Sequence, residues 1–254
     1  METHPKTALV TGASRGLGRS TALRLAARGV DLIVTYHSDA VAANYVVAVA
    51  KEYGSSAVAL PLDTGDVGCF DEFVAEVRRT LEQTRDCDSF DFLVNNAGIG
   101  FHAAFADTTE NDFDQLMNVH FKGVYFLTQK LLPVLANGGR IVNMSTGLTR
   151  FTMEGHSAYA SMKGAIEVLT RYLAAELAPR GIRVNTVAPG PVATDFSGGV
   201  VRDDEQVNGF LAAQTALGRV GLPDDIGGVI CALLSEDTGW INGQRIEASG
   251  GIFL

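Results

Sequence analysis

The chain is short of cysteine and has no cluster of metal-binding side chains, and these shortages exclude two classes of protein. Its cysteines, Cys69, Cys87 and Cys231, are an odd number with no Cys-x-x-Cys spacing and no histidine at metal-ligand spacing. We therefore expect neither a disulfide framework nor a metal site. Three cysteines with neither a disulfide nor a metal-binding role are typical of a protein in a reducing compartment.

Basic runs and long apolar runs are also missing. The net charge is −9 and no segment is rich in Lys and Arg, so we expect no nucleic-acid partner. No apolar run approaches the length that crosses a bilayer. The N-terminal residues do not place a basic segment before an apolar one, as a signal peptide would. The sequence thus predicts a cytoplasmic protein with no membrane partner.

Short, nearly continuous apolar segments alternate with segments of helical length along the chain. The expected strands are 6–12, 30–36, 57–63, 90–96, 139–145, 182–190 and 244–248, and the expected helices are 17–28, 40–53, 70–84, 112–136, 158–178 and 223–235. Strands that are apolar throughout are typical of a parallel sheet covered on both faces, and the alternation indicates βαβ units. The sequence predicts one α/β domain over residues 1–254, with a seven-stranded parallel sheet.

Residues 195–216 depart from this alternation. The segment "DFSGGVVRDDEQVNGFLAAQTA" has a Gly-Gly pair, a charge cluster and weak periodicity. Long insertions after a strand in a compact domain are usually functional or disordered. A lid over the substrate is one hypothesis, and a plain surface helix is the other.

A glycine-rich turn joins the first strand to the first helix. Gly12, Gly16 and Gly18 have the spacing G-x-x-x-G-x-G in "TGASRGLG". Glycines at this junction permit a tight turn and close backbone approach, and the helix N-terminus offers free N–H groups to a pyrophosphate. The turn therefore predicts a dinucleotide site.

The end of the second strand favours NADP(H) over NAD(H). It reads Tyr36, His37 and Ser38, with no acidic residue before Asp39 to bind both ribose hydroxyls. Arg15, in the glycine turn, suits a 2′-phosphate because guanidinium presents a planar fork of donors. The alternative is that Arg15 points to solvent and either cofactor binds. Asp63, after the third strand, is a candidate to meet the adenine or a plain turn former.

A phenol and an amine lie four residues apart in "YASMK". Tyr159 and Lys163 would share one face of a helix, one turn apart. Taken alone, the pattern also fits an exposed tyrosine and a solvated lysine.

Six motifs in order resemble the short-chain dehydrogenase/reductase family over essentially the whole chain. They are "TGASRGLG" at 11–18, "NNAG" at 95–98, Asn118 in "NVHFKG", "YASMK" at 159–163, "APGPVAT" at 188–194 and "INGQRIEASGG" at 241–251. The resemblance implies a Rossmann-type domain that binds NAD(P)(H), usually in dimers or tetramers.

The resemblance also implies a role for each matching residue. Tyr159 would be the general acid, Lys163 would favour the phenolate and hold the nicotinamide ribose, and Asn118 would hold a water molecule in a proton relay. The candidate cofactor-binding residues are Gly12, Ser14, Arg15, Gly16, Leu17, Gly18, Tyr36, His37, Ser38, Asp63, Asn95, Ala97, Gly98, Tyr159, Lys163, Pro189, Gly190, Val192 and Thr194.

The hydroxyl that polarises the carbonyl departs from the family pattern. The family usually has serine thirteen residues before its tyrosine, and here that position is Thr146, with Ser145 just before it. Neighbours along a strand point to opposite faces, so only one of the two can face the substrate. Register favours Thr146 as the oxyanion donor, and a local bend would favour Ser145.

The substrate pocket should be largely apolar, with Phe101, Phe151, Met153 and Phe196 on its walls. His156 is expected to line it rather than to catalyse. The leading hypothesis is an NADPH-dependent ketone reductase acting on a small-molecule carbonyl. The alternatives are a 3-oxoacyl-carrier-protein reductase, an alcohol, sugar or steroid dehydrogenase, and a non-catalytic dinucleotide sensor. Arg140, Arg171, Arg180 and Arg183 are candidates for a carrier-protein landing patch.

Assembly is predicted from two helical segments. Residues 112–136 and 157–178 carry apolar residues on more than one face, which calls for a second burying surface. The set is Leu116, Val119, Phe126, Leu127, Ile166, Leu169, Leu173 and Leu177. We expect a homotetramer, or else a homodimer.

Overall fold

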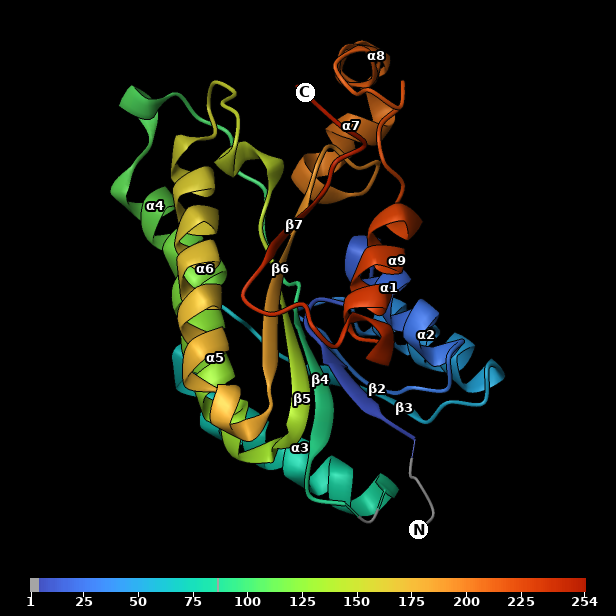
Figure 1. The fold of residues 1–254 in the computed structure, drawn as a ribbon. Helices are drawn as coiled ribbons and strands as arrows, with labels where there is room; N and C mark the ends of the chain where they lie inside the picture. The colour runs from blue at the N-terminus through green and yellow to red at the C-terminus, as the bar shows by residue number, and fades with distance from the viewer. Residues whose placement is uncertain (1–4, 86) are drawn as a thin grey trace.

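One parallel sheet forms the centre of the protein (Figure 1). The computed structural model describes residues 5–85 and 87–254, so part of the segment that bears on a signal peptide, residues 1–4, lies outside the described residues. The strands, β1 to β7, are Thr7–Val10, Asp31–Tyr36, Ala57–Pro61, Phe90–Asn95, Leu135–Met144, Arg183–Pro189 and Arg245–Ala248. Their order is β3-β2-β1-β4-β5-β6-β7, and each neighbouring pair is parallel. The predicted seven-stranded sheet is confirmed.

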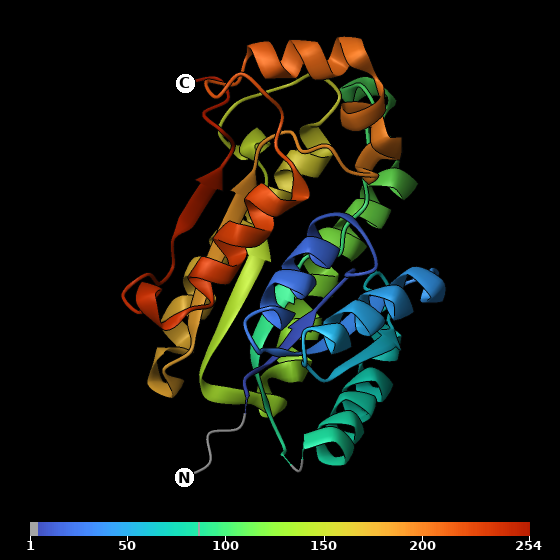
Figure 2. The same ribbon diagram turned by 90° about the vertical axis from the view of Figure 1, so that its right-hand side faces the viewer.

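Helices cover both faces of the sheet, as Figures 1 and 2 show. On one face lie α1 (Gly16–Ala26), α2 (Ala40–Glu52) and α9 (Pro223–Leu233). On the other lie α3 (Phe70–Arg85), α5 (Gly123–Leu131) and α6 (Ser157–Glu176). Neighbouring residues of β1 pack on opposite faces of the sheet. Val10 packs in the core beneath α1, α2 and α9, and Leu9 packs in the core beneath α3, α5 and α6. This two-sided burial explains why the strands are apolar throughout.

The segment predicted as one helix over 112–136 is divided in the structure. Helix α4 (Glu110–Met117) is followed by a π-helical turn over Asn118–Lys122, then by α5. Pro133 lies just past α5, where it cannot continue the helix, and β5 begins at Leu135. Gly123 is needed at the π turn, since a Cβ there would collide with the Thr64 carbonyl. π-Helical turns are frequent at functional sites.

The segment 195–216 forms short helices above the carboxyl end of the sheet. They are a 3₁₀ turn over Phe196–Gly199, α7 (Val200–Asp203) and α8 (Glu205–Ala213). Figures 1 and 2 place α7, α8 and the C-terminus at this same end. Leu211 of α8 packs with Ile252, so the segment is joined to the C-terminal residues. Among the described residues, no helix is long and apolar enough to cross a membrane.

Candidate active site

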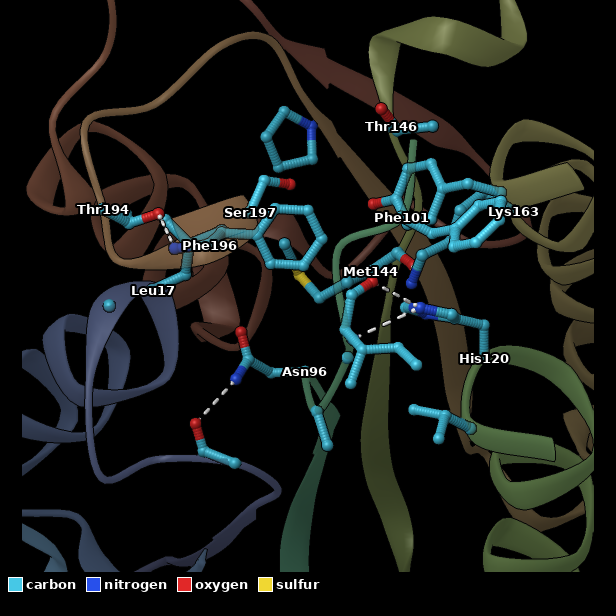
Figure 3. A pocket seen from close by; sticks show the side chains of 18 of the residues that line it. Leu17, Asn96, Phe101, His120, Met144, Thr146, Lys163, Thr194, Phe196 and Ser197 are labelled. Atoms are coloured by element: carbon cyan, nitrogen blue, oxygen red, sulfur yellow. Dashed lines mark hydrogen bonds between the residues drawn. The ribbon is translucent and has the colours of Figure 1, made fainter. Parts of the chain in front are cut away.

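A cavity of about 1370 Å³ opens where the strands end, and it is lined from both sides of the sheet's centre. Parallel strands deliver all their carboxyl ends to one edge, so residues distant in sequence meet there. Figure 3 looks into the cavity, with Leu17 and Thr194 on one side and Thr146 and Lys163 on the other. Phe196 projects between these two groups.

The glycine turn after β1 forms one end of the cavity. Gly12 has a φ of +63°, and a Cβ on it would lie 2.9 Å from the Ala97 Cα. Asn96 secures this close approach, because its Nδ2 donates to the carbonyls of Thr11 (2.8 Å) and Gly12 (3.1 Å). Helix α1 begins directly after the turn and has no acidic residue in its first turn. Its free N–H groups are therefore available to an anion without a competing carboxylate.

The outer wall of this end carries the residues that were predicted to bind the adenosine part of the cofactor, including its ribose. Arg15, His37, Ser38 and Asp63 all line the cavity. The Asp39 carboxylate accepts a hydrogen bond from the Ala42 amide (2.8 Å), and thus caps α2. His37 Nε2 lies 3.6 Å from an Asp63 carboxylate oxygen. The wall therefore carries a guanidinium, an imidazole and a hydroxyl beside the carboxylates of Asp39 and Asp63.

Tyr159 and Lys163 lie one turn apart on α6, as the sequence predicts, and both face the cavity. The Lys163 ammonium lies 5.8 Å from the centre of the Tyr159 ring. Lys163 is only 4% exposed, and its Nζ donates to the Met144 carbonyl at 2.9 Å. Within the described part of the chain, no ion pair gives this ammonium a carboxylate partner. Burial consequently lowers the pKa of Lys163 to about 7.

Tyr159 is held in its protonated form. Burial raises the pKa of the phenol above its ordinary value, and a hydrogen bond with Thr146 opposes part of that rise. The neutral phenol is the form that donates a proton at neutral pH. The ring also contacts Phe196, with centroids 6.0 Å apart.

Thr146 and Ser145 point to different surroundings at the end of β5. The Ser145 hydroxyl donates to Glu167 Oε1 at 2.6 Å, on the helix side of the strand. The Thr146 hydroxyl interacts with Tyr159 and accepts from the Leu148 amide at 3.3 Å. The strand alternation thus continues through Ser145, with no bend that would exchange the two.

A charged network fixes the backbone behind Thr146. Arg245 of β7 donates to Glu167 Oε1 (2.7 Å) and to the Thr146 carbonyl (3.2 Å). Its Nη1 also pairs with Glu247, which forms a second ion pair with Arg150. These contacts hold the pKa of Glu247 low, at about 2, so this carboxylate is charged at neutral pH. Arg150 also donates a hydrogen bond to the carbonyl of Ile252, a residue that lines the cavity.

Most of the predicted site residues come together. Those lining the cavity are Gly12, Ser14, Arg15, Gly16, Leu17, His37, Ser38, Asp63, Ala97, Gly98, Asn118, Thr146, Tyr159, Lys163, Pro189, Gly190, Val192 and Thr194. Gly18, Tyr36 and Asn95 do not belong to the lining. The Asn95 amide lies in the core, where it donates to Thr128 and Asn143, and its neighbour Asn96 lines the cavity instead.

Two cavity histidines, His120 and His102, were not singled out from the sequence, although His102 lies in the loop 98–105 that was expected to line the pocket. His120 lies two residues after Asn118 in the π turn, and its ring is 5.1 Å from that of Tyr159. In the sequence it stands out only as a histidine in the same "NVHFKG" motif as Asn118. His102 meets His156 at the substrate end, with ring centroids 5.1 Å apart. His156 lines the cavity, as predicted.

The apolar pocket wall is as predicted, whereas two of the four arginines suggested for a basic landing patch make structural contacts within the chain. Phe101, Phe151, Met153 and Phe196 all line the cavity. In contrast, Arg140 is 4% exposed and is bonded to Glu236 and to the Leu234 carbonyl. Arg180 donates to the carbonyls of Leu132 and Leu135. Both arginines are therefore held by hydrogen bonds within the chain, at the opposite end of the sheet from the cavity.

Comparisons with known proteins agree with this geometry. Residues 12–252 match the family model described as enoyl-(acyl carrier protein) reductase. The chain is 35% identical to the tetrahydroxynaphthalene reductase of Pyricularia oryzae, over 97% of this chain and 89% of that protein.

Solved structures give the same relationship. The reductase LugOII, which catalyses keto-reduction at C1 during lugdunomycin biosynthesis, superposes with a TM-score of 0.93 and 37% identity, covering 98% of both chains. The angucycline C-6 ketoreductase LanV, with bound NADP, has a TM-score of 0.93 and 36% identity, covering 98% of this chain and 95% of that one. The protein therefore belongs to the short-chain dehydrogenase/reductase family and is an NAD(P)-dependent oxidoreductase.

Proposed function

We propose that this protein reduces a ring ketone of a flat, polycyclic substrate to the secondary alcohol, with NADPH as the hydride donor. Hydride would add to the carbonyl carbon, and Tyr159 would give its proton to the carbonyl oxygen. The observation that carries the proposal is the meeting of Thr146, Tyr159 and Lys163 at the apolar end of a cavity whose other end is the glycine turn.

The residues present fit a dinucleotide. The positive φ of Gly12 and Gly16 and the close packing of Gly12 on Ala97 leave a groove that side chains would fill. The start of α1 would take the pyrophosphate, Lys163 the nicotinamide ribose, and Val192 and Thr194 the carboxamide. The nicotinamide would supply the hydride.

The choice of NADPH follows from the outer wall. Arg15, His37 and Ser38 offer a guanidinium, an imidazole and a hydroxyl to a 2′-phosphate, and Asp39, the first acid after β2, caps α2. Two relatives, LanV and a short-chain dehydrogenase of Burkholderia cenocepacia, are known with NADP bound. These observations support NADPH over NADH.

Each group of the proposed mechanism has a distinct task. Thr146 would donate to the carbonyl oxygen as negative charge develops there. Tyr159, kept neutral by burial, would complete the alcohol, and Lys163 would stabilise the phenolate that remains. Asn118, which lines the cavity at the start of the π turn, keeps its proposed role in proton supply.

The substrate class is inferred from the wall and from the relatives. Phe101, Phe151 and Phe196 provide aromatic faces, and the segment 195–216 adds Val200 and Leu211. Aromatic rings pack well against flat aromatic ligands. The relatives named above act on hydroxynaphthalenes and angucyclines. We propose that the segment 195–216 is the lid that covers such a substrate.

Competing functions have less support. The arginines suggested for a carrier-protein patch include two that are committed to structural contacts. A dinucleotide sensor has no use for a protonated phenol beside a buried ammonium. An oxidative dehydrogenase would use the same site in reverse, and the direction of turnover distinguishes it.

We also propose that the protein forms a homo-oligomer, with an interface made by different residues from those that the sequence analysis named. Leu116, Leu127, Ile166, Leu169 and Leu177 are buried within the chain and need no second surface. The exposed apolar side chains of these helices are Phe113, Tyr125, Val168 and Tyr172. They supply the outward apolar surface that a tetramer or dimer would bury.

The proposed function is tested by a substrate panel. NADPH and NADH oxidation would be followed with 2-tetralone, ethyl acetoacetate and an acetoacetyl thioester. We expect the bicyclic ketone with NADPH to give the highest kcat/KM, by about tenfold or more, because each buried apolar group adds about 1 kcal/mol of binding. Preferential turnover of the thioester would contradict the proposal and favour acyl-chain reduction.

Arg15 provides the test of cofactor choice. Replacing Arg15→Ala should raise the KM for NADPH by about 10- to 100-fold, since a charge-assisted hydrogen bond contributes about 1.5–3 kcal/mol. The KM for NADH should change little. Arg19→Ala is the matched control, because Arg19 stacks over Tyr45 outside the cavity lining. An equal loss for both cofactors would show that Arg15 does not read the phosphate.

Thr146 and Ser145 are separated by three substitutions. Thr146→Val should lower kcat by about 10²- to 10³-fold, the cost of removing one oxyanion donor, whereas Thr146→Ser should keep most activity. Ser145→Ala should act mainly on stability, since its hydroxyl is bonded to Glu167. A large kcat loss in Ser145→Ala with normal turnover in Thr146→Val would move the donor role to Ser145.

A further inference from the structure

His120 is a buried titratable residue to which the proposed mechanism gives no part. It lies in the π-helical turn between α4 and α5 and is fully buried. Its ring meets the Tyr159 ring edge to face, with centroids 5.1 Å apart and planes 88° apart. Such pairs contribute about 0.5–1.5 kcal/mol beyond their buried area. The contact therefore restricts how the proton-donating phenol lies.

The other edge of the imidazole is fixed to the cofactor wall. Nε2 lies 2.9 Å from the Ile99 carbonyl and 3.3 Å from the Ile99 amide. One nitrogen cannot donate and accept at the same time, and the shorter contact identifies Nε2–H as the donor to the carbonyl. Figure 3 shows both contacts as dashed lines. His120 thus links the segment after β4 to Tyr159.

The surrounding residues make room for this ring. A Cβ on Gly98 would lie 2.8 Å from the His120 Cε1, so the imidazole occupies the space that a side chain at 98 would need. Gly98 and Ile99 both line the cavity. The imidazole is therefore wedged between the cofactor wall and the phenol.

The imidazole is neutral. Its Nδ1 is buried and has no hydrogen-bond partner in the described part of the chain, so a proton on it would be left without an acceptor. Burial and the nearby Lys163 ammonium lower the pKa of His120 to about 3. The titratable groups that face it are Tyr159 and Lys163 of α6. A neutral ring leaves Lys163 as the one cation beside the phenol among the described residues.

We propose that His120 is a positioning residue for Tyr159: it anchors the phenol to the Ile99 carbonyl and holds it in line for proton transfer. This rests on the proposed function of Tyr159 as the proton donor. The arrangement connects the wall that would carry the cofactor to the group that protonates the product. Misplacement of a catalytic group by about 1 Å can cost about 10²-fold in rate.

Two variants separate the two contacts of the His120 ring, the aromatic contact with Tyr159 and the hydrogen bond to the Ile99 carbonyl. His120→Phe keeps an aromatic edge against Tyr159 and removes the Nε2–H donor, and His120→Gln keeps an N–H and removes the ring. We expect both to lower kcat by about 10- to 100-fold, with the KM for NADPH nearly unchanged and with a larger solvent deuterium isotope effect on kcat. The isotope effect should rise because a misplaced donor makes proton transfer more rate-limiting.

Val124→Ala is the matched control. Val124 packs between the same helices as the π turn, against Ile166 and Leu169, and does not line the cavity. It should lower the midpoint of thermal unfolding and leave the isotope effect unchanged. An unchanged kcat in both folded His120 variants, or a loss confined to the KM for NADPH, would overturn the proposal.

Imidazole ¹⁵N NMR of the unaltered protein tests the same proposal without a variant and without turnover. We expect one histidine to remain the neutral Nε2–H tautomer between pH 5 and 8, and to be absent from the spectrum of His120→Phe. A signal from His120 that titrates in this range, or the Nδ1–H tautomer, would overturn it. If no ketone is reduced, the proposed function fails, while this spectrum still reports on His120.

Discussion

The hydrogen bond from the Lys163 ammonium to the Met144 carbonyl joins α6 to the carboxyl end of β5, and the site depends on it. It brings the helix that carries Tyr159 to the strand end that carries Thr146. Burial destabilises the charged form of Lys163 and lowers its pKa to about 7. The same burial keeps the Tyr159 phenol protonated. The hydrogen bond thus joins the two elements that carry the reacting groups, and the desolvation of each group sets its protonation.

Close backbone approach supplies the second constraint. Gly12 packs on the Ala97 backbone, and Gly98 leaves room for the His120 imidazole, so the glycine turn, the segment after β4 and the π turn lie close together. Side chains placed behind this stack then hold it: Asn96 donates to the glycine turn, and Arg245 donates to the Thr146 carbonyl. The reacting groups are therefore positioned mainly by contacts between segments far apart in sequence.

The elements that the sequence predicts well are those set by local patterns. The strands were identified because two-sided burial makes them apolar throughout, and Tyr159 and Lys163 were paired because i and i+4 share a helical face. The alternation along β5 also predicted that Thr146 and Ser145 would face different surroundings, as they do. The helix expected over 112–136 contains a π turn and gives way to β5 at Leu135, and local periodicity reported neither feature.

Residues whose importance comes from long-range contacts were not predictable in this way. Asn96 lines the cavity in place of Asn95 because the chain turns sharply after β4. His120 is notable only because Tyr159 and Ile99 pack against it from other segments. Likewise, the apolar faces of the two long helices looked like an oligomer interface, yet many of those residues are buried by the chain itself.

The most direct test of this account is the rate of ketone reduction by Tyr159→Phe, measured together with its NADPH affinity. We expect kcat to fall by about 10²- to 10⁴-fold, the usual contribution of a general acid, while the Kd for NADPH from fluorescence titration stays nearly constant. A variant that binds NADPH normally and still reduces the ketone at a rate close to that of the unaltered protein would show that the buried phenol is not the proton donor.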